Sequence, residues 1–250
     1  HFADPSRQIE RKLVSVDKIV IAALQTFHGP PTNLELIREV KLDDKCVTVA
    51  VNGEDLYVGT ENGRVVKIDT QDQQVIIDDF GNCYIVGLVI HSDDLFVLNT
   101  ESGSKTGLFQ YNLRTNRQNR FWVHTDKAGY KGSRMVVTQN QLVVADITSH
   151  RLTVYSLTGQ LIRHISCPEI STGWVSMCSS PTNPDGIIMS DYNSSKVFAV
   201  NLTTGAILWT NSDIRKPQGI VAYGSQHVLV TTESITTQLW ILNTYTGMYS

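Results

Sequence analysis

An apolar strand motif occurs five times along the chain, and this repetition constrains the fold more than any other feature of the sequence. The copies lie at residues 56–60, 95–99, 142–146, 187–191 and 228–232, about 43 residues apart. A second strand-like segment follows each copy after a short polar stretch. These second segments lie at residues 65–69, 108–112, 152–156, 197–201 and 239–243. Units of this length, recurring at a regular interval, predict a repeat architecture.

Each unit contains up to four strand-like segments and no helical periodicity. A further apolar segment precedes each motif, at residues 47–51, 86–90, 135–138, 175–178 and 220–223. A fourth segment is visible at residues 160–165 and 206–209, after turns rich in the Asn, Thr and Gly that tight hairpins need. Four short strands per unit predict an all-β chain folded as a β-propeller of four-stranded blades, because one such sheet cannot bury both of its faces alone.

The five visible repeats leave the number of blades open between five and six. Residues 34–40 read as an outer strand that could complete the last blade, whose own fourth strand is almost missing. That arrangement gives five blades. Residues 18–24 form another apolar stretch that could supply part of a sixth blade. We therefore divide the chain into an N-terminal linker or partial blade, residues 1–33, and a propeller, residues 34–250.

The composition excludes several classes of protein. With 41% hydrophobic residues the chain has enough apolar mass for a core, which excludes a disordered chain. A net charge of −3 argues against a generally basic nucleic-acid binder, and no apolar run reaches the roughly 18–20 residues that span a membrane. The four cysteines lack the C-x-x-C spacing of zinc or redox sites. We therefore expect unreactive thiols and a cytoplasmic location.

The third repeat resembles an NHL repeat. Residues 142–155 read Leu-Val-Val-Ala-Asp-Ile-Thr-Ser-His-Arg-Leu-Thr-Val-Tyr. This is an apolar strand ending in Ala-Asp, then a polar turn, then His-Arg, then a strand with an aromatic residue. The other repeats depart from the pattern, and the fourth has Ser195 and Lys196 in place of His-Arg. The resemblance implies an NHL-like β-propeller, a fold that usually has six blades.

The resemblance to NHL propellers also implies a function. Such propellers often form the C-terminal part of TRIM-type ubiquitin ligases, where they recruit a protein, an RNA hairpin or single-stranded RNA. This chain has no Cys/His spacing of a RING or B-box domain, so ligase chemistry would lie in an upstream RING, B-box and coiled-coil region outside it. We therefore expect a non-catalytic recognition module that binds protein or RNA.

A second propeller family offers an alternative. Residues 197–209 resemble a quinoprotein-type repeat, in which a tryptophan docks on the neighbouring blade, and this would make the chain a scaffold. A lactonase-like propeller would instead be a metal-dependent hydrolase that holds calcium with Glu, Asn and Asp in its channel. We place no such set on the inner strands, and the histidines share no metal-ligand spacing. We predict no catalytic residue, no metal and no cofactor, and we expect His150 to be a structural turn residue.

Basic and aromatic residues are interleaved between residues 114 and 134, a combination suited to phosphate neutralisation and base stacking. In a propeller, the crossing loop between blades and the loop between the second and third strands share one face. The predicted ligand-binding residues on that face are His124, Lys127, Tyr130, Lys131, Arg134, Arg151, Arg215 and Lys216. Equivalent loop positions add Arg64, Lys105 and Lys196.

These loop cations also have a structural interpretation. They could pair with Asp146, Asp191 or Glu61 as surface salt bridges, which contribute little energy. We favour ligand binding for the face as a whole, because propeller loops commonly carry function. The expected partner is RNA or an acidic protein segment, and no membrane interaction is expected.

Overall fold

The computed structural model describes residues 7–15, 18–25, 33–101, 106–115, 117–124, 134–233 and 239–249. Every regular element within these residues is a strand. The strands are β1 (Arg7–Ser15), β2 (Lys18–Gln25), β3 (Asn33–Lys41), β4 (Cys46–Asn52), β5 (Asp55–Thr60), β6 (Arg64–Ile68), β7 (Gln74–Asp79), β8 (Cys83–His91), β9 (Asp94–Glu101), β10 (Thr106–Asn112), β11 (Arg117–His124), β12 (Met135–Thr138), β13 (Gln141–Asp146), β14 (Arg151–Ser156), β15 (Leu161–Ser166), β16 (Val175–Ser179), β17 (Gly186–Asp191), β18 (Lys196–Asn201), β19 (Ile207–Asn211), β20 (Pro217–Tyr223), β21 (His227–Thr232) and β22 (Leu239–Asn243). Across the described ranges, no helix is long and apolar enough to cross a membrane.

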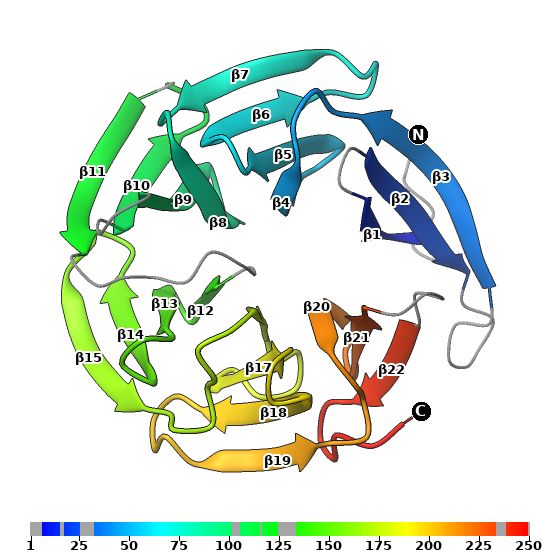
Figure 1. The fold of residues 1–250 in the computed structure, drawn as a ribbon, viewed down its shortest axis with the longest axis vertical. Helices are drawn as coiled ribbons and strands as arrows, with labels where there is room; N and C mark the ends of the chain where they lie inside the picture. The colour runs from blue at the N-terminus through cyan, green and yellow to red at the C-terminus, as the bar shows by residue number, and fades with distance from the viewer. Residues whose placement is uncertain are drawn as a thin grey trace.

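The strands form antiparallel sheets arranged in a ring around a central axis (Figure 1). Blades one to four are β4–β7, β8–β11, β12–β15 and β16–β19, and each has four strands. Blade five is the sheet β20–β22, in which the place of a fourth strand is marked by a single bridge between Leu242 and Tyr249. These five blades correspond to the five sequence repeats. The prediction of an all-β propeller built from four-stranded blades is confirmed.

Strands β1, β2 and β3 add a further three-stranded sheet to the ring, between blade one and blade five (Figure 1). Strand β3 pairs with β2, with Val40 opposite Ile19. The segment 34–40 therefore does not complete the last blade, and the stretch 18–24 supplies a strand of the extra sheet. Pairing between strands that are close in sequence closes a shorter loop, which costs less entropy than joining the two ends of the chain.

The turns between third and fourth strands form as their Asn, Thr and Gly residues predict. In blade four, Asn201 Oδ1 accepts hydrogen bonds from the backbone amides of Thr203 (2.9 Å) and Thr204 (2.8 Å). The corresponding turn of blade five contains Gly247 at a φ of 69°, a conformation that favours glycine. A Cβ atom at Gly247 would also collide with the Trp209 ring of the preceding blade. The glycine thus serves both the turn and the contact between blades.

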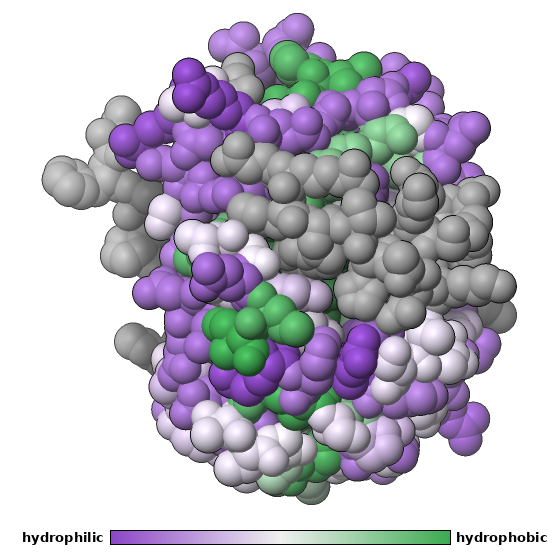
Figure 2. Space-filling model, turned by 90° about the vertical axis from the view of Figure 1, so that its left-hand side faces the viewer, coloured by the Kyte–Doolittle hydropathy of each residue, from purple (hydrophilic) through white to green (hydrophobic). Residues whose placement is uncertain are grey.

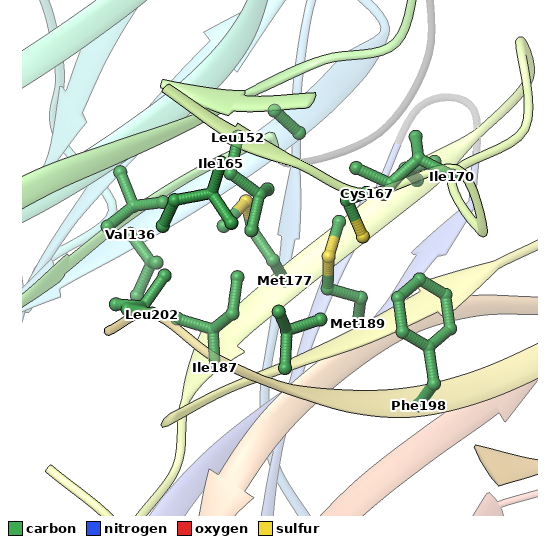
Figure 3. Close-up of a cluster of buried hydrophobic side chains, with 14 of the residues drawn as sticks. Val136, Leu152, Ile165, Cys167, Ile170, Met177, Ile187, Met189, Phe198 and Leu202 are labelled. Carbon is green, nitrogen blue, oxygen red and sulfur yellow. The ribbon is translucent and has the colours of Figure 1, made fainter. Parts of the chain in front are cut away.

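The hydrophobic core lies between neighbouring blades. Figure 3 shows one cluster, in which Leu152 and Ile165 of blade three pack with Met189 and Phe198 of blade four. The side chains of Leu152, Met189 and Phe198 are completely buried. Complete burial of a side chain of this size contributes about 1.5–3 kcal/mol. Each blade is therefore stabilised mainly by the blade beside it.

The outer strands expose a few apolar side chains at the rim of the ring. Examples are Val75 and Ile76 on β7, and Leu161 and Ile162 on β15. On the side that carries β11 and β15, the hydrophobic patches are small and separated by hydrophilic surface (Figure 2). Patches of this size are ordinary on folded proteins and do not indicate a binding site by themselves.

Candidate functional site

One face of the propeller is built from two kinds of loop, as the sequence predicts. The turns between second and third strands include residues 147–150 and 192–195, and the crossing loops between blades include residues 167–174 and 212–216. These loops are joined by hydrogen bonds from Tyr192 N to Trp174 O (2.9 Å) and from Lys216 N to Ser195 Oγ (3.2 Å). We call this surface the loop face.

A polar residue stands at the end of the second strand of each blade, or two residues before the end in blade two. These residues, which we call the caps, are Thr60, Asn99, Asp146, Asp191 and Thr232. Asp146 Oδ1 accepts a hydrogen bond from Ser149 N (3.1 Å), and Asp191 Oδ1 accepts one from Ser194 N (3.0 Å). A side-chain acceptor at this position binds a turn N–H that has no backbone partner in the sheet. The Asp of the NHL-like motif therefore shapes the loop face.

Asp191 is the most deeply buried of these caps, with an exposed fraction of 0%. Its carboxylate also accepts hydrogen bonds from Ser171 N and Ser171 Oγ, both at 2.6 Å. The side chain thereby fixes the crossing loop from blade three against the turn of blade four. A buried carboxylate is tolerated because several donors satisfy it.

The His-Arg pair of the third repeat is likewise used to build the turn. His150 adopts a φ of 49°, and its Nδ1 atom hydrogen-bonds to Ile170 O in the crossing loop. Arg151 forms an ion pair with Asp146, with Nη2 at 2.9 Å from Oδ2. The structural interpretation of His150 is confirmed, and Arg151 has one of the carboxylate partners that the salt-bridge alternative named.

The secondary basic positions do not form a continuous ring of free positive charge in the described part of the chain. Arg64 pairs with Asp79 at 3.1 Å, while Glu61, one of the three carboxylates named as possible partners of the loop cations, lies 3.3 Å from Lys45. Lys196 is half-buried. The prediction for Lys105 falls outside the described residues.

Arg134 does not lie on the exposed surface, contrary to the prediction. Its exposed fraction is 1%. Its backbone N–H donates to Val86 O (3.2 Å) and its carbonyl accepts from Ala145 N (3.0 Å), so the residue is held between blades two and three. Loss of hydration lowers the pKa of its guanidinium to about 10, although the nearby carboxylate of Asp146 raises it. Arg134 is therefore part of the interior.

The remaining predicted residues of the stretch 114–134 cannot be placed on the loop face from the structure. Lys127, Tyr130 and Lys131 lie outside the described residues. His124 ends strand β11, and only its backbone is described. These positions stay predictions.

Arg215 and Lys216 are exposed on the loop face, and Lys216 belongs to a cluster that sequence reasoning missed. Tyr192 Oη donates a hydrogen bond to Glu233 Oε2, and Lys216 Nζ lies 4.0 Å from the same carboxylate. Lys216 Nζ also lies 5.3 Å from the centroid of the Tyr192 ring. The Trp174 ring lies beside the Tyr192 ring, with 6.4 Å between the two ring centroids. We call these four residues the Tyr192 cluster.

Four different loops supply the Tyr192 cluster. Tyr192 follows the cap Asp191, and Glu233 follows Thr232 at the equivalent position of blade five. The pKa of Lys216 is raised, first by its hydrogen bond to Tyr192 and then by the charge interactions with Tyr192 and Glu233. The position directly after each cap was the signal that could have identified Tyr192 and Glu233 as neighbours on this face.

The cysteines and the metal-ligating residues add no further site in the described ranges. All four cysteines are buried and free. Burial raises the pKa of the Cys46 and Cys167 thiols to about 12, which keeps them protonated at neutral pH. Among the described residues, no group of three or more His, Cys, Asp or Glu side chains is placed to hold a metal ion.

Comparison with known proteins shows the fold but no family. No protein-family model matches the chain, and no curated protein matches it. A protein of unknown function from Bacteroides caccae is similar in structure, with a TM-score of 0.70 and 11% identity over 98% of this chain and 93% of that one. A chain of the nidogen/laminin complex has a TM-score of 0.60 and 14% identity over 86% and 84%. BamB from Moraxella catarrhalis has a TM-score of 0.56 and 12% identity over 91% and 68%.

Proposed function

We propose that this chain is a non-catalytic recognition module that binds a partner protein through its loop face, with the Tyr192 cluster at the centre of the contact. The observation that carries the proposal is the composition of this cluster. Two half-exposed aromatic side chains, Trp174 and Tyr192, lie beside an exposed pair of opposite charges, Lys216 and Glu233. Aromatic residues surrounded by charged groups are typical of the energetically important part of a protein-binding surface.

The charges of the loop face favour a protein partner over RNA. Arg64, Arg151 and Lys216 each have a carboxylate oxygen within 4.0 Å. A carboxylate beside a cation repels a phosphate group and cancels much of its attraction to the cation. A polypeptide can present both signs of charge to such a surface. Of the two expected partners, RNA and a protein segment, we therefore propose the protein segment.

Because the third repeat resembles NHL repeats, the module could form one part of a larger multidomain protein. We propose that it serves as the substrate-binding part of a TRIM-like ubiquitin ligase, whose RING chemistry lies outside these residues. The motif residues Asp146, His150 and Arg151 are engaged in building the turn. Contact with a substrate then falls to neighbouring loop residues such as Tyr192.

The proposal is tested by selecting peptides from a phage-displayed library on the wild-type chain. We expect the selected peptides to bind the Trp174→Ala/Tyr192→Ala variant at least tenfold more weakly, since truncating central aromatic residues commonly costs more than about 1.4 kcal/mol. Tyr245→Ala is the matched control, because Tyr245 is an exposed tyrosine, 63% accessible, that lies outside the Tyr192 cluster on a turn between third and fourth strands. Peptides that bind both variants like the wild type would contradict the proposal.

A binding experiment with RNA distinguishes an RNA partner from a protein partner. A fluorescein-labelled oligouridine and a labelled RNA hairpin are titrated with the chain at low salt. We expect no binding that depends on Tyr192. Binding whose affinity falls steeply with salt, by about one log–log slope unit per phosphate contact, would overturn the choice of a protein partner.

A second candidate function, a quinoprotein-like scaffold, is favoured by one contact. Trp209 of blade four donates a hydrogen bond from Nε1 to Thr244 O of blade five at 2.8 Å, and its ring packs against Gly247. This is the docking of a tryptophan on the neighbouring blade that the resemblance of residues 197–209 implies. A scaffold of this kind predicts that the library yields no peptide whose binding depends on the Tyr192 cluster.

A further inference from the structure

Blades one, four and five each carry a pair of residues at the same two positions of the loop face. One residue stands directly before the first strand of the blade, and the other directly follows the cap of the second strand. The pairs are Lys45 and Glu61 in blade one, Trp174 and Tyr192 in blade four, and Lys216 and Glu233 in blade five. In each pair the backbone N–H of the second residue donates to the carbonyl of the first, at 2.9 Å in blades one and four and at 3.2 Å in blade five. The repeat thus fixes where these side chains start.

The pairs of blades four and five meet at the side chain of Tyr192. Tyr192 Oη donates a hydrogen bond to Glu233 Oε2, and Lys216 Nζ lies 4.0 Å from the same oxygen. Lys216 Nζ also lies 5.3 Å from the centroid of the Tyr192 ring. A cation in this position is attracted both by the aromatic ring and by the carboxylate. Tyr192 and Glu233 therefore form a cation site, and Lys216 occupies it in the structure.

Lys216 is held only weakly in the cation site. The side chains of Lys216 and Glu233 are 57% and 55% exposed, and an ion pair that is exposed to this degree contributes little energy. The backbone of Lys216 is fixed separately, because its N–H donates to Ser195 Oγ and its carbonyl accepts from Glu233 N. Only the lysine side chain has to move to vacate the site, and the loops around it can stay in place.

A guanidinium group suits the cation site better than an ammonium group does. It is planar, it stacks on aromatic rings, and it can direct two N–H groups at one carboxylate. The contacts of Glu233 with Tyr192 and Lys216 both use Oε2, and Oε1 has no hydrogen-bond partner in the described part of the chain. The half-buried ring of Trp174 lies beside Tyr192 and adds apolar surface next to the site. An arginine side chain can therefore use both the ring and the carboxylate.

We propose that the cation site binds an arginine side chain of the partner protein, and that this arginine displaces Lys216 from Tyr192 and Glu233. This inference rests on the proposed function, since it names what the Tyr192 cluster recognises in the partner. Lys216 then acts as an internal competitor. It lowers the apparent affinity for the partner by the fraction of molecules in which the lysine fills the site.

The first experiment uses three peptides that differ in one side chain. They are acetyl-Gly-Ser-Arg-Ser-Gly-amide and its counterparts with lysine or with citrulline, which has nearly the shape of arginine but no charge. Each is titrated at low salt into isotope-labelled protein, and the amides of Tyr192 and Glu233 are followed by NMR. We expect the arginine peptide to bind at least threefold more tightly than the lysine peptide and at least fivefold more tightly than the citrulline peptide.

The second experiment removes the competitor and the carboxylate in turn. Lys216→Ala should bind the arginine peptide at least threefold more tightly than the wild type, because the site is then vacant. Glu233→Gln should bind it at least fivefold more weakly, because the charge that attracts the guanidinium is lost. Lys45→Ala and Glu61→Gln are the matched controls, since they change the equivalent pair of blade one, and both should bind like the wild type.

Two results would overturn the proposal. The citrulline peptide could bind as tightly as the arginine peptide, which would show that charge is not recognised. Lys216→Ala could weaken binding of the arginine peptide, which would make the lysine a contact to the partner instead of its competitor. The proposed function fails or stands separately: library peptides that need Trp174 and Tyr192 but bind Glu233→Gln like the wild type would overturn the arginine site and leave protein binding by the loop face intact.

Discussion

Blades four and five have the same strand pattern but differ in how completely that pattern is covered. Phe198 in β18 and Trp240 in β22 stand at equivalent positions, three residues before the turn asparagine of each blade. Phe198 has an exposed fraction of 0%, whereas Trp240 is half-buried. The larger of the two aromatic side chains, Trp240, is therefore the less buried one. In these two blades, the buried third strand is the one that pairs with a fourth strand along its length within the described residues.

The caps of the second strands differ in the same direction. Asp191 in blade four accepts three hydrogen bonds that fasten a turn and a crossing loop. Thr232 in blade five is also buried, but its hydroxyl has no hydrogen-bond partner among the described residues. Within the described residues, blade four has both a paired fourth strand and a cap that accepts three hydrogen bonds, whereas blade five has a single bridge and a cap without a side-chain hydrogen bond.

The largest expected effect comes from truncating the two equivalent aromatic residues. Phe198→Ala should lower the free energy of unfolding by about 4 kcal/mol, because it removes a fully buried ring and leaves a cavity. Trp240→Ala should cost about half as much, since its ring is partly in water already. Urea unfolding followed by circular dichroism measures both values. Equal losses would mean that the edge of β22 is covered in solution, and the contrast between the blades would disappear.

The strands and turns of both blades could be predicted from the sequence because they depend on local chemistry. The alternation of apolar segments marks the strands, and residues such as Asn201 and Gly247 mark the turns by their own hydrogen-bonding and φ preferences. The shared face of turns and crossing loops also followed from the repeat. These features need no knowledge of what lies across the blade boundary.

The parts that could not be predicted depend on contacts between blades. Arg134 was placed at a loop tip by its position in a basic stretch, but the residue is enclosed by blades two and three. The Tyr192 cluster joins residues from four loops. The repeat puts Tyr192 and Glu233 at equivalent positions after the caps, but nothing in the sequence shows that their side chains meet each other and Lys216. The sequence left five and six blades open, and it did not show that β3 pairs with β2.

The second prediction compares the two caps. Asp191→Ala should lower the free energy of unfolding by about 3 kcal/mol or more, because it leaves the amides of Ser171 and Ser194 without their buried acceptor. Thr232→Val keeps the shape of the side chain and removes only an unpaired hydroxyl, so it should change stability by no more than about 0.5 kcal/mol. The same urea titrations measure both. A large loss for Thr232→Val would show that its hydroxyl has a partner in solution, and the difference between the caps would then fail.

The smallest effect concerns the link between the two blades. Trp209→Phe removes the Nε1 donor to Thr244 O and keeps an aromatic ring against Gly247. The expected cost is about 1 kcal/mol, the net contribution of one hydrogen bond with a carbonyl left unpaired. Leu208→Ala is the matched control, because Leu208 lies on the same strand and is 47% exposed, so its loss should stay within about 0.5 kcal/mol. Since Thr244 belongs to blade five, hydrogen exchange of the β22 amides should quicken in Trp209→Phe and stay unchanged in Leu208→Ala. If exchange quickens equally in blades three and five, the tryptophan does not act through blade five, and the stability of blade five has another source.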